Sequence, residues 1–130
     1  MVIIEGKIKG KARPRVFNGH AITPADTVNY ENWVKICYKE QDGRYLEGSV
    51  KATITAYYKI PKSYTKKRVQ AINEGLEFPT KKPDVDNIAK IILDSLNGIA
   101  YKDDSQIVNL TVTKKYTDNI ERVMLELEEI

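Results

Sequence analysis

Four aspartates and one lysine in the second half of the chain have types and spacing that could do chemistry. Asp84 and Asp86 form one pair, Asp103 and Asp104 form another, and Lys90 follows the first pair by four residues. Carboxylate oxygens are the ligands that Mg²⁺ prefers, and a nearby lysine can stabilise negative charge on a phosphate. If folding brings both pairs together, three of these four carboxylates and the lysine would form a divalent-metal phosphodiesterase site.

A helix is predicted to hold the first pair. Pro83 and Asp84 are typical of a helix start with Asp84 as the N-cap, and Asn97-Gly98 is typical of a helix end. One apolar face is predicted from helical spacing, at Val85, Ile88, Ala89, Ile92, Leu93 and Leu96. Because a cap residue is not helical, the carboxylates of Asp84 and Asp86 can converge just before the first turn.

A purely structural role for the same residues stays open. Carboxylates at a helix N-terminus are common as caps and dipole partners, and Asp86 with Lys90 has the spacing of an ordinary ion pair within one helix. A calcium-binding loop is excluded, because Ile88 and Ala89 stand where a ligand and the turn glycine would be required.

With their surroundings, these residues resemble the RusA family of Holliday junction resolvases. The family pattern is a Pro-Asp-x-Asp-Asn helix start, a lysine one turn later, a Leu-Asp-x-Leu-Asn-Gly-like helix end and an Asp-Asp-x-Gln loop. All parts are present in that order, beginning at Pro83, Lys90, Leu93 and Asp103. Gly10-Lys11-Ala12-Arg13-Pro14-Arg15 and Thr23-Pro24 resemble further family elements, so the likeness covers nearly the whole chain.

The resemblance implies a magnesium-dependent, structure-selective endodeoxyribonuclease that resolves four-way DNA junctions by paired phosphodiester hydrolysis in recombination and repair. Its metal would be Mg²⁺, with Mn²⁺ as a substitute, and no organic cofactor is expected. The implied catalytic residues are Asp84, Asp86, Lys90 and Asp104, of which the three aspartates would be metal ligands. Asp103 would lie behind the ligands and Asp94 would be a surface partner of Lys90. The short link after Gly98 leaves open which aspartate of the second pair is the ligand.

A homodimer is the expected assembly, because a junction has near two-fold symmetry and needs two opposed nicks. Two other functions remain open at this point. The carboxylates could merely cap and pair in a non-catalytic protein that binds DNA junctions or single strands, or the same residues could serve a metal-dependent RNase.

Basic residues that could bind a nucleic-acid backbone fall in two groups. They are Lys11, Arg13 and Arg15 in the first group, and Lys66, Lys67, Arg68, Lys81 and Lys82 in the second. The alternate spacing of the first group would make a cationic ribbon, although a solvated strand edge explains it equally well. In the second group, cations at the start of a short helix oppose the helix dipole, which favours an external anion.

Composition indicates one ordinary soluble globular domain, 1–130, with 42% hydrophobic and 30% charged residues and a net charge of +3. One cysteine excludes a disulfide framework and a cysteine-based zinc cluster. His20 is the only histidine in the sequence, so a histidine-based hydrolytic triad is not expected. No signal-peptide pattern or membrane-spanning stretch is found. We therefore expect a cytoplasmic protein without a membrane partner, and the resemblance to the RusA family implies a bacterial or phage origin.

An α+β fold is predicted from the order of the elements. The first half is expected to contain a strand at 2–9, a helix after Thr23-Pro24 and a strand at 50–60. A short helical or irregular segment at 61–75 and the helix from Asp84 follow. The alternating segments around 108–113 and 123–127 are expected to form a closing antiparallel hairpin. Together, the strands would form one mixed sheet with two main helices packed on it and the first two strands parallel. The first helix is predicted to bury Tyr30, Trp33, Val34, Cys37 and Tyr38.

Overall fold

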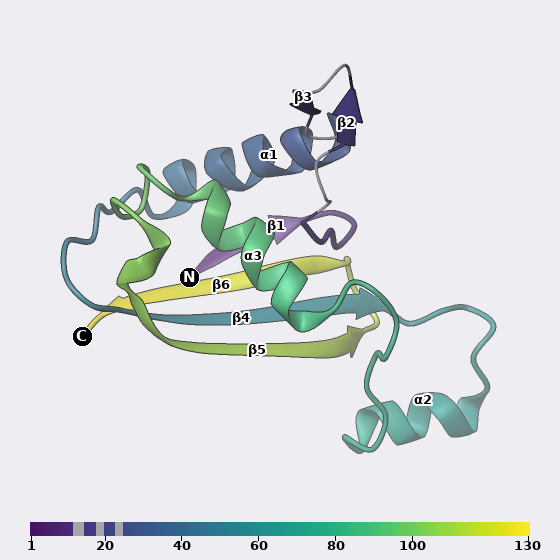
Figure 1. The fold of residues 1–130 in the computed structure, drawn as a ribbon. Coiled ribbons are helices and arrows are strands. Elements are labelled where there is room, and N and C mark those ends of the chain that lie inside the picture. The colour runs from purple at the N-terminus through teal and green to yellow at the C-terminus, as the bar shows by residue number, and fades with distance from the viewer. Residues whose placement is uncertain (12–14, 18–19, 23–24) are drawn as a thin grey trace.

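The computed structural model describes residues 1–11, 15–17, 20–22 and 25–130. Its elements in chain order are β1 (Val2–Glu5), β2 (Arg15–Phe17), β3 (His20–Ile22), α1 (Ala25–Gln41), β4 (Val50–Lys59), α2 (Lys66–Asn73), α3 (Val85–Ser95), the short 3-10 helix η1 (Asp104–Gln106), β5 (Ile107–Thr117) and β6 (Arg122–Glu129). The helices α1 and α3 cover one face of a four-stranded mixed sheet, and α2 stands beyond its end (Figure 1). The predicted α+β fold is confirmed.

Strand β4 is at the centre of the sheet because its whole inner face is apolar. Alternate residues from Val50 to Tyr58 are buried, as their period of two predicted. It pairs with β5 in parallel and with β6 in antiparallel orientation, so that Ile54 lies opposite Val112 on one side and Leu125 on the other. The buried face of β4 packs beneath the helices in the main core.

The two C-terminal strands do not form the predicted antiparallel hairpin. The strand order is β1-β6-β4-β5, so β4 lies between β5 and β6. β1 pairs with β6 rather than with β4; because β1 and β4 both run antiparallel to β6, the first two strands are parallel as predicted, although they are not neighbours. Alternation defines which face a residue occupies but not which strand is its neighbour. Val108 and Leu110, on the edge strand β5, are both exposed.

The N-terminal strand is shorter than the predicted segment 2–9. It ends at Glu5, and the next residue, Gly6, has a φ of 126°, which only glycine adopts readily. The antiparallel β2–β3 hairpin was not predicted, although Asn18-Gly19 between its strands is a typical hairpin signal. The predicted start of the first helix at Thr23-Pro24 lies outside the described residues.

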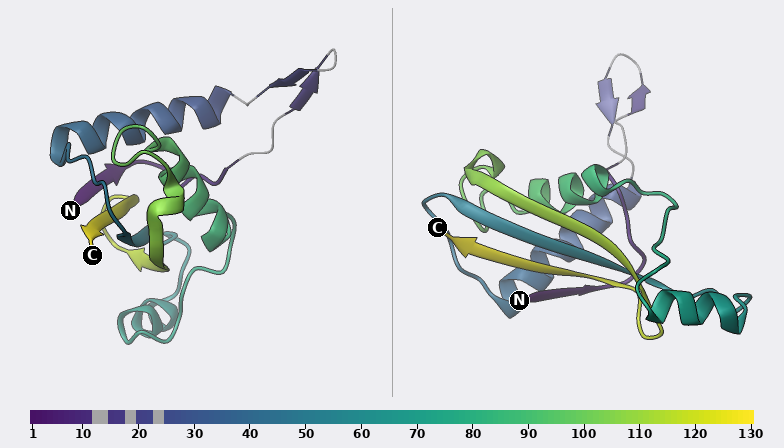
Figure 2. Two further views of the ribbon diagram at one scale, coloured as in Figure 1. Left: turned by 60° about the vertical axis from the view of Figure 1, so that its left-hand side comes forward. Right: turned by 90° about the horizontal axis from the view of Figure 1, so that it is seen from below.

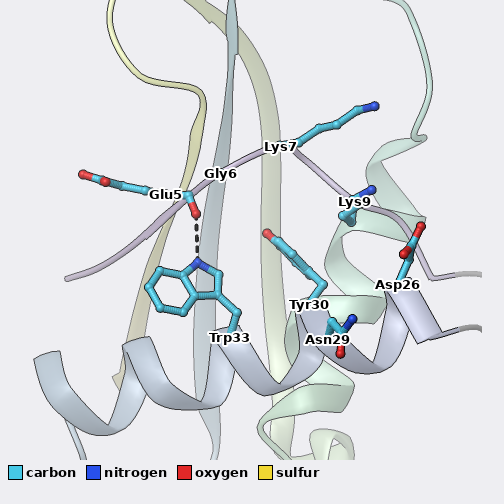
Figure 3. A pocket seen from close by; sticks show the side chains of 8 residues that line it. All are labelled: Glu5, Gly6, Lys7, Lys9, Asp26, Asn29, Tyr30 and Trp33. Carbon is cyan, nitrogen blue, oxygen red and sulfur yellow. Dashed lines mark hydrogen bonds between the residues drawn. The ribbon is translucent and has the colours of Figure 1, made fainter.

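Helix α1 both fills the core and covers the open edge of β1. Four of the five predicted core residues are buried, but Trp33 is 42% exposed, so its prediction was wrong. Its indole N–H donates to the carbonyl oxygen of Glu5 at 2.8 Å, and both residues line a cavity of about 290 Å³ (Figure 3). The amide of Gln41 donates to and accepts from the backbone of Ile3, both at 2.7 Å. These side chains satisfy edge groups that would otherwise be unpaired.

Helix α3 lies beside α1 and carries the most apolar face of the three helices. Its buried residues include five of the six predicted ones, with Ile91 in addition. Val85, the first residue of the helix, is 44% exposed, so its predicted burial was wrong. None of the helices in the part of the chain that the structure describes is long and apolar enough to cross a membrane.

Candidate active site

Asp84 occupies the predicted N-cap position of α3 but does not act as a side-chain cap. Its backbone is extended, with φ −68° and ψ 156°, and its carboxylate makes no capping hydrogen bond. The backbone N–H of Ile88 donates to the Asp84 carbonyl oxygen at 3.0 Å and begins the helix. An N-cap aspartate normally accepts from the N–H two or three residues on. The structural alternative therefore does not account for the carboxylate of Asp84.

Asp86 and Lys90 lie one turn apart on the exposed side of α3. In the described part of the chain, neither forms an ion pair within 4.0 Å, so the alternative in which they simply pair is not what the fold contains. Both side chains instead line a cavity of about 400 Å³ between α3, η1 and β5. Its lining residues are Asp86, Ala89, Lys90, Leu93, Asp94, Asp104 and Leu110.

The two aspartates of the second pair have different surroundings. Asp103 is exposed and caps η1: its carboxylate accepts from the backbone N–H of Ser105 at 3.0 Å. Hydrogen bonding from the Ser105 side chain first, and from its backbone N–H second, holds the pKa of Asp103 below its usual value. Asp104 is half-buried and lines the cavity with Asp86. Geometry therefore separates a capping aspartate from one that reaches the cavity.

Gln106 fixes the loop that carries Asp104. Its side-chain oxygen accepts from the backbone N–H of Lys102 at 2.9 Å and of Asp103 at 3.3 Å. Its side-chain nitrogen donates to the carbonyl oxygens of Leu46 at 3.0 Å and Gly48 at 3.1 Å. One side chain thus joins the aspartate loop to the segment before β4, which explains why a glutamine in this place serves the site.

Replacing Gln106 with alanine is expected to lower the free energy of unfolding by about 1–3 kcal/mol, because two carbonyls and two amides lose their partner. Gln106→Glu keeps the acceptor but sets a carboxylate against two carbonyl oxygens, so it should be at least as harmful. Thermal and urea unfolding measure the change. Gln70→Ala is the matched control, because the Gln70 side chain donates to the exposed carboxylate of Glu74, four residues on; an equal loss there would contradict the role of Gln106.

Asp94 joins the site, which the sequence analysis missed. Burial raises the pKa of Asp104 first, and hydrogen bonding to Asp94 together with its negative charge raises that pKa further. Asp94 is not the partner of Lys90 that was predicted: its carboxylate lies 3.6 Å from the ammonium nitrogen of Lys11. A signal was available, because Asp86, Lys90 and Asp94 follow one another at intervals of four and so share one stripe of the helix.

The donor set suits a hard divalent cation chemically. Its side chains offer only carboxylate oxygens, and Asp94 and Asp104 repel one another in a way that a cation would offset. Among residues 1–11, 15–17, 20–22 and 25–130, however, no three His, Cys, Asp or Glu side chains form a group that could hold a metal ion. Metal binding by Asp84, Asp86 and Asp104 therefore stays a prediction, and Asp84 is not one of the cavity residues.

The first predicted DNA-binding group begins beside the site. The ammonium of Lys11 lies 2.9 Å from Glu31, in addition to its contact with Asp94. Gly10 packs so closely on the start of α3 that an added Cβ would lie 2.7 Å from the Cβ of Pro83. Arg15 is in β2, and Arg13 lies outside the described residues, so DNA binding by this group stays a prediction.

The second predicted group surrounds α2. Lys66 and Lys67 are exposed in its first turn, and Lys82 is exposed shortly before α3. Arg68 forms a salt bridge to Glu77 at 2.8 Å and stacks 3.6 Å above the ring centre of Tyr64. The ammonium of Lys81 lies 5.2 Å from the ring centre of Tyr58. DNA binding by these residues stays a prediction.

The comparisons with known proteins agree with the motif. The family model described as endodeoxyribonuclease RusA matches residues 5–128, nearly the whole chain. A Bacillus subtilis (strain 168) protein, named Uncharacterized protein YqaN, is 35% identical over 127 residues, which covers 94% of this chain and 89% of that relative. The fold is an α+β domain with one mixed sheet, and its cavity between α3, η1 and β5 is lined by carboxylates and a lysine. The chain belongs to the RusA endodeoxyribonuclease family, whose members act on branched DNA and generally depend on a divalent metal.

Proposed function

We propose that this protein is a magnesium-dependent endonuclease that resolves four-way DNA junctions by paired phosphodiester hydrolysis, in recombination and repair. One observation supports the proposal above all others in this member of the RusA family. The side chains of Asp86, Lys90, Asp94 and Asp104 line a single open cavity, with carboxylates on two sides and a lysine that has no carboxylate within 4.0 Å among the described residues.

In this proposal Asp84, Asp86 and Asp104 hold Mg²⁺, with Mn²⁺ able to replace it, and Asp94 supports Asp104 from the helix. When bound, the metal supplies Lewis-acid stabilisation of the scissile phosphate and activation of water. Lys90 places a fixed positive charge beside the phosphate, where negative charge grows in the transition state.

Lys11 offsets the charge of Asp94 and Glu31 without entering the cavity, since it is not among the cavity residues. A homodimer would supply two such sites, one for each of the two opposed strands that must be cut.

Cleavage of a synthetic four-way junction tests the proposal. End-labelled junction and a duplex of the same sequence are incubated with the protein in Mg²⁺, in Mn²⁺ or in excess EDTA. We expect metal-dependent nicks at symmetric positions in two opposed strands of the junction and none in the duplex. Junction binding without nicks in either metal would indicate the non-catalytic alternative, and cleavage of an RNA junction alone would indicate an RNase.

A plasmid that extrudes a cruciform tests the paired action. Two nicks made within the lifetime of one complex give linear DNA directly, whereas independent single nicks give a relaxed circle first. We expect linear product at a protein concentration where sedimentation finds a dimer. A monomer that yields only relaxed circles would contradict the dimeric part of the proposal.

A further inference from the structure

The segment 60–82 is an appendage whose composition the core does not explain. In Figure 1 and in both views of Figure 2, α2 lies beyond the end of the sheet where β4 and β5 finish. No residue of α2 is buried. Two apolar side chains nearby are open to solvent, Leu76 with 74% and Phe78 with 49% of their surface exposed. Core packing therefore cannot be the reason for these side chains.

A cavity of about 490 Å³ lies between this segment and β5, and we call it the α2 pocket. This volume is in the range of small-molecule sites, ~300–1,000 Å³. Its lining combines aromatic rings with cations: Tyr64, Arg68, Leu76, Glu77, Phe78, Thr80, Lys81 and Tyr116. Flat rings and a guanidinium group are the surfaces on which nucleic-acid bases stack.

Side-chain contacts within the α2 pocket hold it in shape. The hydroxyl oxygens of Tyr64 and Tyr116 are 3.0 Å apart, and their rings meet edge to face at 5.9 Å. Arg68 is fixed between Tyr64 and Glu77, with its guanidinium 3.6 Å above the tyrosine ring centre. These contacts join α2 to the end of β5, so the pocket is preorganised.

The charge around the pocket favours a polyanion. Residues 60–82 contain six lysines and arginines and only two carboxylates, Glu74 and Glu77, which gives +4 when the whole chain carries +3. Arg68 and Glu77 neutralise one another. Within the described residues, the other five cations, Lys62, Lys66, Lys67, Lys81 and Lys82, have no carboxylate within 4.0 Å. Unpaired lysines around an aromatic pocket match a phosphate backbone that carries bases.

The pocket is also close to the candidate active site along the chain. Phe78 precedes Asp84 by six residues, so their Cα atoms are at most ~22 Å apart. This distance corresponds to about six nucleotides of a stacked strand, at ~3.4 Å per nucleotide. Asp84 is one of the proposed metal ligands, so a strand cut at the proposed metal site can reach the α2 pocket.

We propose that the α2 pocket receives one unpaired base of the DNA substrate, stacked on Phe78, while the surrounding lysines contact the adjacent phosphates. The proposal rests on the function proposed above and deepens it, since it assigns a second contact with an unpaired nucleotide near the branch. The pocket selects branched over continuous duplex DNA, because an unpaired or weakly paired base is the least costly to unstack.

The test uses four-way junctions that carry the fluorescent base 2-aminopurine at successive positions within six nucleotides of the crossover. Binding is measured in EDTA, by 2-aminopurine fluorescence and by anisotropy of a dye on a distant arm, over a range of salt concentrations. With the parent protein we expect one position to change fluorescence on binding. Phe78→Leu should abolish that change and weaken binding about 5- to 100-fold, with an unaltered salt slope. Phe78→Trp, which keeps an aromatic ring, should retain both the fluorescence change and the affinity of the parent.

Two further variants separate stacking from charge. Lys66→Gln with Lys67→Gln should reduce the slope of log affinity against log salt by ~0.7–0.9 for each lost contact and keep the fluorescence change. Tyr45→Leu is the matched aromatic control. Tyr45 is 52% exposed and precedes the start of β4, at the other end of that strand from the α2 pocket, so this variant should behave like the parent.

The outcomes distinguish this proposal from the proposed function. Parent-like fluorescence and affinity in Phe78→Leu, in a protein that still cleaves junctions with Mg²⁺, would overturn the base pocket alone. Loss of the fluorescence change in Phe78→Leu, in a protein that never cleaves, would support the pocket and overturn the nuclease. A parent protein that binds no junction would overturn both.

Discussion

Lys90→Gln is expected to slow single-turnover cleavage of a pre-bound four-way junction by about 10²–10³-fold, the usual loss when one transition-state donor is removed. The side chain lines the carboxylate cavity and, among the described residues, has no carboxylate within 4.0 Å. Even an exposed ion pair would stabilise the fold by only ~0.3–0.5 kcal/mol, so the variant should unfold like the parent. Chemistry rather than folding would carry the effect.

Two control variants show whether the effect depends on the shape of the Lys90 side chain and on its position in the protein. Lys90→Arg keeps the charge but replaces a compact ammonium with a planar fork, so we expect it to be impaired as well. Lys39→Gln removes an exposed lysine from the last turn of α1 and should cleave like the parent. A Lys90→Gln rate within a few-fold of the parent would remove the lysine from the mechanism and leave the carboxylates alone.

Asp104→Asn is expected to abolish cleavage and to retain junction binding, because it removes a proposed metal ligand and also a negative charge near the phosphates. The same substitution should not lower the thermal stability of the protein and could raise it. The pKa of Asp104 is raised by burial and by Asp94, so its ionised form at neutral pH destabilises the folded state. The neutral amide should therefore unfold at the same temperature as the parent or higher, which thermal melts at neutral pH will measure.

Asp103→Asn is the matched control, an identical change one residue earlier. Asparagine caps helices about as well as aspartate, so we expect a normal fold and cleavage within a few-fold of the parent. Asp84→Asn and Asp86→Asn should behave like Asp104→Asn if both are ligands. Loss of binding and of thermal stability in all three would instead indicate a structural role for the carboxylates.

Much of the site follows from local sequence. Position along a helix is set by residues within a turn or two, so the start of α3 at Asp84 and the four-residue step from Asp86 to Lys90 were predictable. The same holds for the buried face of β4, which a period of two defines. Local patterns also carried the resemblance to the RusA family, which the match over residues 5–128 confirms.

Tertiary structure decided which segments meet. The period of a strand does not name its neighbour, so the insertion of β4 between β5 and β6 could not be predicted from alternation. The contact of Asp94 with Asp104 and Lys11 joins three segments distant in the chain. The bonds from Gln106 to Leu46 and Gly48 span about sixty residues.

Exposure was the other property that spacing alone misassigned. Trp33 has the spacing of a core residue, yet it faces solvent because β1 has an open edge that its indole N–H can satisfy. Phe78 is a large apolar residue, yet about half of its surface is exposed at the rim of the α2 pocket, since no core lies beneath that segment. Sequence determined which side chains could do chemistry, and only the folded chain decided which of them share a cavity, because that depends on contacts between residues far apart in the chain.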